Sequence, residues 1–222
     1  MTLKPNLDIL PAPQRALWPE LGMTPQGFTL YGGTALALRL GHRASADFDF
    51  FSNASFDPDD LARDVPYIRD AERVQVGPDT LTCRVERGGP VLVSFFGGLG
   101  LGQVAARERV WNMPLHVASP LDIAGTKAAV VQKRAEAKDY IDIDALLQHG
   151  IDLSTVLAAG AVVYGRNFNP LITLKALSFF DDVPGLPRDV QARLARAVEA
   201  VDVTQLPVLT PYIMRPENGI TL

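Results

Sequence analysis

The stretch Gly27-Phe-Thr-Leu-Tyr31-Gly32-Gly33-Thr34, followed at a short distance by Asp47-Phe-Asp-Phe-Phe51, decides the fold. Residues 27–31 are rich in β-forming side chains and predict a strand. That strand runs directly into two glycines and then into residues 35–40, which are strong helix formers. Residues 47–51 alternate with a period of two, which predicts a second strand. The sequence therefore predicts a strand–glycine turn–helix–strand unit near the N-terminus.

The chain around this unit divides into a strand-rich front and a helical back. Three further strands are predicted over 72–76, 80–86 and 90–96. These segments are rich in β-forming residues and are separated by glycine-containing turns. Shorter helices are predicted over 8–22, where prolines interrupt the pattern, and from Asp57 to Arg63, with Pro58 at the first helical position. From about residue 119 the pattern is helical, with helices predicted over 120–134, 137–148, 153–164, 169–180 and 187–200. We expect an α+β fold, with an α/β domain over residues 1–118 and a helical domain over 119–222 packed on it.

Composition narrows the class of protein. The 222 residues are 47% hydrophobic and 21% charged, which is ordinary for a globular chain. The net charge of −4 provides no global basic field, so a nucleic-acid partner would need a local basic patch. A single cysteine excludes an internal disulfide framework. No targeting segment is visible and no apolar run approaches the roughly 18 residues of a membrane span. We therefore expect a cytoplasmic protein without a membrane partner.

The glycine turn and the acidic strand together predict a phosphate and metal site. Gly32 and Gly33 expose backbone N–H groups at a helix N-terminus, which suits a phosphate, and Thr34 adds a hydroxyl donor. Asp47 and Asp49 are two apart on a strand, so both carboxylates point to one face. Two like charges on one face repel unless a cation bridges them, and Mg²⁺ prefers carboxylates together with substrate phosphates. This combination is typical of metal-assisted phosphoryl or nucleotidyl transfer.

These motifs resemble a known family. Gly32-Gly-Thr-Ala-Leu-Ala-Leu38 and Gly41-His-Arg-Ala-Ser-Ala-Asp-Phe-Asp-Phe-Phe51 are similar to the AbiEii-type toxin nucleotidyltransferases, which belong to the polymerase-β-like superfamily. The resemblance implies a nucleotidyltransferase-like mixed sheet with flanking helices. It also implies that Gly32, Gly33 and Thr34 hold a nucleoside triphosphate and that Asp47 and Asp49 bind Mg²⁺.

Two motifs in the second half strengthen the resemblance. Asp122-Ile-Ala-Gly-Thr-Lys127 and Lys138-Asp-Tyr-Ile-Asp142 resemble the family's Asp-x-x-x-x-Lys and basic-Asp-x-x-Asp motifs. Lys127, Arg134 and Lys138 would share one face if the helix continued, forming a local positive patch. Asp139 and Asp142 would share a face as well. The resemblance implies that Lys127 and Lys138 meet the triphosphate and that Asp139 or Asp142 orients the site or the acceptor.

One departure concerns a third carboxylate. Many nucleotidyltransferases place one on a strand beside the Asp-x-Asp strand, and here Ser94 occupies that position. A neutral hydroxyl is a weaker Mg²⁺ ligand than a carboxylate and a poor general base. Glu86 and Asp139 are the candidate substitutes. His42, in the loop before Asp47, is a candidate phosphate contact.

The sequence leaves more than one function open. The first is a Mg²⁺-dependent nucleotidyltransferase that acts on a tRNA or protein acceptor, as the toxin of a toxin–antitoxin pair with an antitoxin protein as its partner. The second is an NTP-binding or protein-interaction module without turnover, which Ser94 favours. The third is a nucleotidyltransferase for a small molecule, as in other branches of the superfamily. Incubation with labelled NTPs and candidate acceptors discriminates among these functions.

Overall fold

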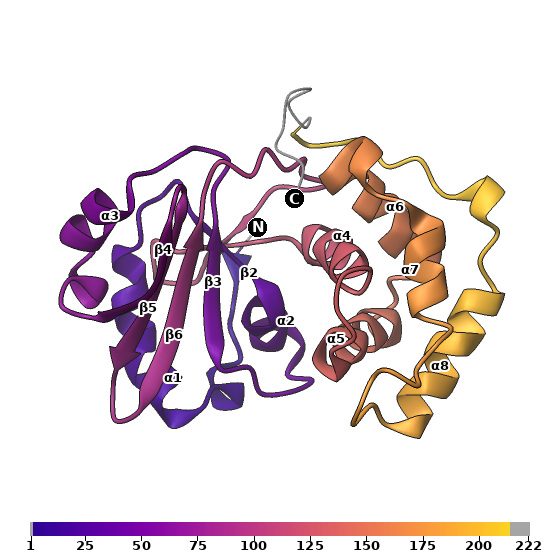
Figure 1. Cartoon of the computed structure of the whole chain (residues 1–222), viewed down its shortest axis with the longest axis horizontal. Helices are drawn as coiled ribbons and strands as arrows, with labels where there is room; N and C mark the ends of the chain where they lie inside the picture. Colours follow the sequence, from indigo (N-terminus) through magenta and orange to yellow (C-terminus); the bar gives the residue numbers. More distant parts are fainter. Residues whose placement is uncertain (1, 214–222) are drawn as a thin grey trace.

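A mixed β-sheet forms the left part of the molecule in a computed structural model that describes residues 2–213 (Figure 1). Its strands are β1 (Thr2–Leu3), β2 (Thr29–Tyr31), β3 (Asp47–Phe51), β4 (Glu72–Gly77), β5 (Thr80–Glu86), β6 (Pro90–Phe96), β7 (Glu108–Val110) and β8 (His116–Val117). Within the described residues they are ordered β1-β7-β8-β2-β3-β6-β5-β4. The central strand β3 pairs antiparallel with β2 and parallel with β6.

Helices flank the sheet and make up the right part of the molecule (Figure 1). The α-helices are α1 (Ala12–Leu17), α2 (Gly32–Leu40), α3 (Pro58–Asp64), α4 (Pro120–Val130), α5 (Ala137–Gln148), α6 (Leu153–Tyr164), α7 (Pro170–Ala176) and α8 (Arg188–Glu199). Short 3-10 helices cover Leu7–Ile9, Trp18–Met23, Pro66–Ile68, Gly165–Asn167 and Val203–Gln205. Helix α2 lies between the sheet and the pair α4–α5, and it contacts β3, α4 and α5 (Figure 1).

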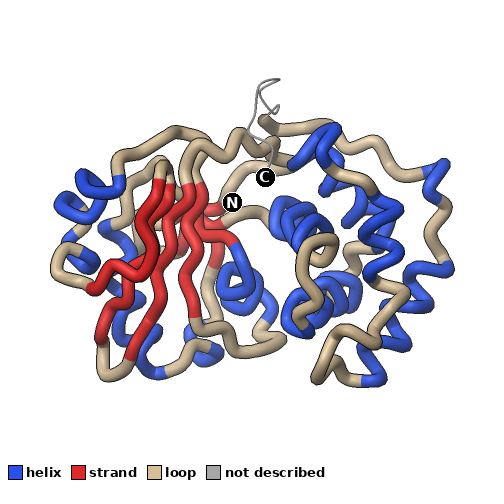
Figure 2. The backbone as a smooth tube through the Cα atoms, in the orientation of Figure 1, coloured by secondary structure: helices blue, strands red, loops and turns tan. Residues whose placement is uncertain are grey.

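The predicted α+β class is confirmed. The described strands all end by Val117 and the helices α4 to α8 follow from Pro120. In Figure 2 the strands gather on the left of the molecule, and helices joined by loops make up its right part. One apolar core nevertheless includes residues of both parts, among them Leu36 of α2 and Ile123 of α4. The division into two domains at residue 118 therefore stays a prediction.

The alternation of β3 separates a core face from a polar face. Phe48 and Phe50 are fully buried, and Phe50 stacks on Phe95 of β6 with ring centroids 5.2 Å apart. Asp47, Asp49 and Phe51 occupy the other face and are only partly buried. Burial of large aromatic side chains fixes the strand register, because a slip by one residue would exchange the two faces.

Two predicted helices are shorter than expected. Helix α4 ends at Val130 and α5 begins at Ala137, so the predicted helix over 120–134 is present but its predicted end is wrong, and Lys127 and Lys138 do not share a helix face. The chain turns between them, which allows Asp139 to reach back to Lys127 at 2.7 Å. Helix α7 likewise ends at Ala176, four residues before the predicted end.

Among the described residues, no single helix is long and apolar enough to cross a membrane, and the pair α5 and Leu153–Asn167 meets that test only jointly, across a bend of 117°.

Candidate active site

The start of α2 is an open backbone cradle. Gly32 has φ +74°, and a Cβ there would lie 2.6 Å from Oδ2 of Asp49. A Cβ on Gly33 would run into the guanidinium of Arg43. Position 32 therefore requires glycine, and a side chain at Gly33 would displace Arg43. No side chain caps α2, so the N–H groups of its first turn are left for an anion.

The two carboxylates beside this cradle point the same way. Asp47 and Asp49 lie on one face of β3, and neither carboxylate forms a hydrogen bond or an ion pair with any described residue. Burial and the neighbouring charge of Asp47 raise the pKa of Asp49 to about 6, against the opposing effect of Lys127. A pair of like charges without a cationic partner fits a divalent cation. Asp47 and Asp49 are therefore the residues that would hold Mg²⁺.

Thr34, whose hydroxyl the sequence predicted to donate to a phosphate, binds the protein's own backbone instead. Its side chain is 1% exposed and its hydroxyl donates a hydrogen bond to the backbone carbonyl of Asp47. The hydroxyl therefore fixes α2 against the start of β3. It is occupied by the protein's own backbone and does not face outward as a phosphate donor.

A buried ionic cluster lies next to the cradle, on the side of the helical half. Asp142 accepts hydrogen bonds from Nε2 of His42 at 2.7 Å and from Nε and Nη2 of Arg43 at 2.6 and 2.8 Å. Nζ of Lys127 lies 2.6 Å from Asp142 and 2.7 Å from Asp139. We call these residues, together with Arg134, the basic cluster.

The basic cluster has more cations than buried carboxylates. Its two buried carboxylates meet three cations, Lys127, Arg43 and Arg134, and the Nε of Arg134 lies 2.8 Å from Asp139. Burial alone would raise the pKa of Asp142, but the hydrogen bond from His42 and the charges of Lys127 and Arg43 hold that pKa well below its usual range. Both acids are therefore ionised at neutral pH. Arg134 also pairs with Glu136, and the charges of Lys127 and Arg134 act on Asp49, while Arg43 lies at Gly33 of the cradle.

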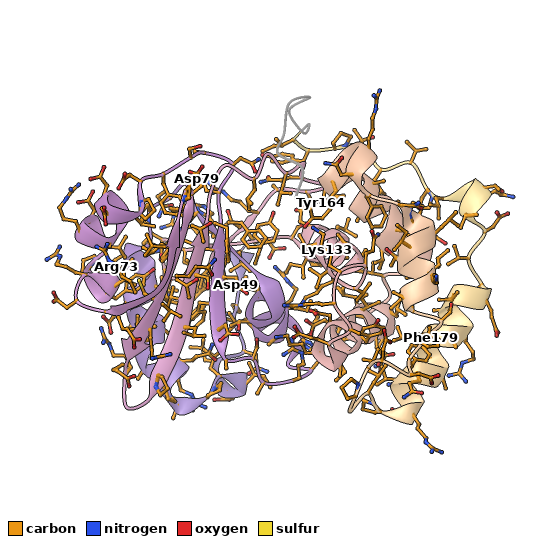
Figure 3. The ribbon with its side chains drawn as sticks, in the orientation of Figure 1. Asp49, Arg73, Asp79, Lys133, Tyr164 and Phe179 are labelled. Carbon is orange, nitrogen blue, oxygen red and sulfur yellow. The ribbon has the colours of Figure 1, made fainter. Side chains whose placement is uncertain are left out.

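Lys138 lies outside this cluster. Its side chain is half exposed and its Nζ forms an ion pair with Glu136 at 2.8 Å. Its charge still acts on Asp49, whose pKa it lowers. Lys138 is thus near the site without being held in it. Figure 3 shows Asp49 on the sheet, with Lys133 and Tyr164 on the helical part opposite.

The third-carboxylate position is occupied by Ser94 in this fold. Ser94 is the direct register partner of Asp49, is 8% exposed, and accepts a hydrogen bond from the hydroxyl of Thr82 at 3.1 Å. Glu86 is exposed and pairs with Pro90. It lies four residues, or about 13 Å, along β5 from Thr82, the residue that pairs with Ser94. Asp139 is committed to Lys127 and Arg134. Within the described part of the chain, no group of three or more potential metal-binding side chains is present.

Sequence reasoning missed Arg43 as a site residue. Its guanidinium touches both the cradle and Asp142, a contact that spans 99 residues of sequence. The available signal was its position in the glycine–histidine–arginine stretch before the acidic strand. The spacing pattern carried no information about a partner so distant in the chain.

The arrangement is that of a nucleotidyltransferase-like fold, in which an open helix N-terminus, a carboxylate pair and a basic cluster converge. The chain belongs to the family described as "Nucleotidyl transferase AbiEii toxin, Type IV TA system", whose model matches residues 24–205. A protein of Aquifex aeolicus, "Uncharacterized protein aq_aa25", is 32% identical over 70% of this chain and 74% of its own.

A solved structure supports the same fold. MenT4, the nucleotidyltransferase toxin Rv2826c from Mycobacterium tuberculosis H37Rv, superimposes with a TM-score of 0.54 and is 18% identical. The match covers 85% of this chain and 84% of that one. The predicted family and nucleotidyltransferase-like fold are therefore confirmed.

Proposed function

We propose that this protein is a Mg²⁺-dependent nucleotidyltransferase that moves a nucleotidyl group from an NTP to an RNA or protein acceptor. One observation carries the proposal. The unpaired carboxylates of Asp47 and Asp49 lie beside the uncapped N-terminus of α2, and the charges of Lys127 and Arg134 in the basic cluster act on Asp49. In a metal–triphosphate complex the metal ion complements the two carboxylates and the triphosphate complements the basic cluster.

Each group has a role in this scheme. The N–H groups at Gly32 and Gly33 and the guanidinium of Arg43 bind phosphate oxygens, and Asp47 and Asp49 hold Mg²⁺. The bound ion supplies charge neutralisation and alignment of the phosphates. The acceptor oxygen forms a bond to the α-phosphorus, the bond to the β-phosphate oxygen breaks, and pyrophosphate leaves with that electron pair.

Asp139 and Asp142 are positioning residues in this proposal. They are fully buried and contact only the protein's own cations, so they act through Lys127, Arg43 and Arg134. By holding those long side chains in one geometry, they remove the entropy cost of ordering them when the triphosphate binds. Ser94 provides no base for the acceptor's proton, and losing a general base costs roughly 10²–10⁴-fold, so we expect slow turnover.

The family also indicates a biological setting. Its description names a type IV toxin–antitoxin system, and MenT4 is described as a toxin. We therefore propose that this enzyme is the toxin of such a pair and that an antitoxin protein counteracts it. Co-expression with the protein from a neighbouring gene, scored by growth of the host, checks this pairing.

The direct test is transfer of labelled nucleotide. Each NTP labelled at the α-phosphate is incubated with Mg²⁺, the protein, and either total tRNA or cellular protein. We expect the label in one acceptor class, and its loss in Asp47→Asn and Asp49→Asn. Asp60→Asn, at an exposed acid on α3, is the matched control and should retain transfer. Transfer at the wild-type rate by Asp49→Asn would refute the proposed role of the carboxylates.

A binding-only module is the second candidate, because Ser94 stands where a third carboxylate is expected. That function predicts Mg²⁺-dependent NTP binding by calorimetry with no label in any acceptor. The same labelled-nucleotide experiment, run beside the binding measurement, separates the two functions.

A further inference from the structure

A large cavity adjoins the carboxylates on the same face of the sheet. It has a volume of about 560 Å³, within the range of small-molecule sites. Its walls come from β2 and the residue Gly27 before it, the end of β3 and the residues that follow it, β8, the loop that precedes β7, and Tyr212 and Ile213 near the end of the described chain. The residues that matter here are Thr29, Tyr31, Phe51, Gln103, Arg107 and His116.

The cavity begins beside Asp49 and extends along the same face of β3 to Phe51. Tyr31 is the register partner of Asp49, and Phe51 follows Asp49 by two residues on the same face of β3. Two residues of strand advance the chain by about 7 Å. A ligand whose phosphates lie at Gly33 and Asp49 can therefore reach this cavity with the group attached to them.

One wall of the cavity is aromatic. The rings of Tyr31 and Phe51 are stacked, with centroids 4.7 Å apart and an interplanar angle of 15°. Phe96 packs edge-on against Phe51 at 5.7 Å and does not line the cavity. Aromatic side chains that line a cavity next to a phosphate site are suited to a planar ring, because every nucleobase offers a π-face.

The loop that contributes Gln103 to the cavity is fixed by the first acid of the Asp-x-x-x-x-Lys motif. Oδ1 of Asp122 accepts a hydrogen bond from the backbone N–H of Val104 at 2.6 Å, and Oδ2 accepts one from the Ser119 hydroxyl at 2.5 Å. The loop beside Gln103 is thereby tied to the N-terminus of α4. The acid of the motif builds the cavity, while its lysine, Lys127, joins the basic cluster.

A histidine, His116, also lines the cavity. Nδ1 of His116 is buried and has no partner among the described residues. Burial and the charges of Arg107 and Arg109 lower the pKa of His116, so its ring is neutral at neutral pH. Because Nδ1 is shielded from solvent, the cavity is lined by the rest of this neutral ring.

We propose that this cavity binds the base of the nucleoside triphosphate, stacked against the Tyr31–Phe51 wall and within reach of His116. The inference rests on the proposed function. It adds a site for the base, because the phosphate cradle meets the same triphosphate in every NTP and cannot distinguish one NTP from another. It assigns selection among NTPs to residues outside the motifs of the family resemblance, apart from Phe51, which ends one motif, and Tyr31, which directly precedes the other.

The test compares two probes by calorimetry in the presence of Mg²⁺. One probe is each of the four NTPs, and the other is inorganic tripolyphosphate, which has no base. We expect Phe51→Ala to weaken the preferred NTP by roughly 5- to 150-fold, the loss typical of one stacking aromatic, and to leave tripolyphosphate unchanged. Phe179→Ala, at an exposed ring that does not line the cavity, is the control and should change neither probe.

The outcomes separate the two proposals. If the wild-type protein binds neither probe, the proposed function fails. If it binds both and Phe51→Ala weakens neither, the cavity does not hold the base and this inference is overturned, even if the same variant weakens RNA binding. Phe51→Leu keeps the bulk of the side chain without its ring, so it repeats the test in case Phe51→Ala unfolds. His116→Ala should reduce discrimination among the four NTPs.

Discussion

The folded protein disfavours the ionised form of the Asp49 carboxyl group. Burial and the charge of Asp47 raise its pKa from 3.8 to about 6, so the folded state binds this proton more tightly than the unfolded chain. The protonated carboxyl group therefore makes its full contribution to the free energy of unfolding below about pH 4. That contribution is lost as the pH rises through about 6. A shift of two units corresponds to about 3 kcal/mol.

Substitution of this residue tests the assignment. In the absence of metal, Asp49→Asn should be as stable as the wild type near pH 4 and more stable above pH 6, by up to about 3 kcal/mol. Urea unfolding across this pH range measures the difference. A stability gap that stays constant between pH 4 and 7 would show that Asp49 titrates normally.

Asp142 is the residue on which the basic cluster depends. It is fully buried and binds side chains from the loop after α2 and from α4. Removing one member of a buried ion pair leaves an uncompensated charge and typically costs about 3–5 kcal/mol. We expect Asp142→Ala to lower the free energy of unfolding by this amount, as measured by urea titration.

The exposed pair between Asp189 and Arg193 is the matched control. Asp189 is 70% exposed, and such surface pairs contribute at most about 1 kcal/mol. Asp189→Ala should therefore be nearly neutral. Equal losses in the two variants would mean that the buried cluster is no stronger than a surface ion pair.

At the scale of elements, the alignment of β3 with β6 places position 94 beside Asp49. Ser94→Asp adds a third carboxylate to this row. Because three like charges repel without a cation, we expect lower stability at pH 7 in EDTA and recovery of that stability when Mg²⁺ is added. Thermal unfolding with and without Mg²⁺ measures this coupling.

The neighbouring strand provides the control for that change. Thr82 sits opposite Ser94 on β5, one strand further from Asp49. Thr82→Asp should lose stability without the same recovery in Mg²⁺. If Ser94→Asp gains nothing from Mg²⁺, position 94 is a structural site in the strand and not the third-ligand position.

The elements that carry strong local signals were predictable. The acidic strand 47–51 and the strands 80–86 and 90–96 coincide with β3, β5 and β6, because period-two alternation and glycine turns mark them. The strands β1, β7 and β8 were missed, since two or three residues give no measurable periodicity. The break between the helices of residues 120–134 and 137–148 was predicted, but α4 ends four residues earlier than expected, because helix formers continue past Val130.

The candidate site was predictable in its local parts only. Period two places Asp47 and Asp49 on one face, and the structure agrees. The pairing of Asp142 with Arg43, and the cavity built by Asp122, join residues far apart in sequence, so no spacing rule reveals them. The occupied hydroxyl of Thr34 was also hidden, because its partner is a backbone carbonyl.

At the scale of the whole molecule, the site draws on both parts of the chain. The cradle and carboxylates come from α2 and β3, and the basic cluster comes mainly from α4 and α5. Since one apolar core joins these parts, ligand binding should stabilise them together. At an NTP concentration 100-fold above its Kd, the gain is about 2.7 kcal/mol, or roughly 5–10 °C in Tm.

Calorimetric unfolding with Mg²⁺ and NTP measures this shift. We expect a single transition that moves upward as a whole, and no shift when EDTA removes the metal. Two separate transitions, of which only one moves, would contradict a shared site.

Both ends of the described chain are attached to the same short stretch. β1 pairs with Arg109 and Val110 of β7, and Ile213 bridges to Gln103, whose backbone exchanges hydrogen bonds with it at 2.9 and 3.1 Å. A tensile load applied between the ends would therefore run through residues 103–110 and bypass the central sheet. These few hydrogen bonds would rupture first, so the molecule would be mechanically weak at its ends while β3, β5 and β6 stayed paired.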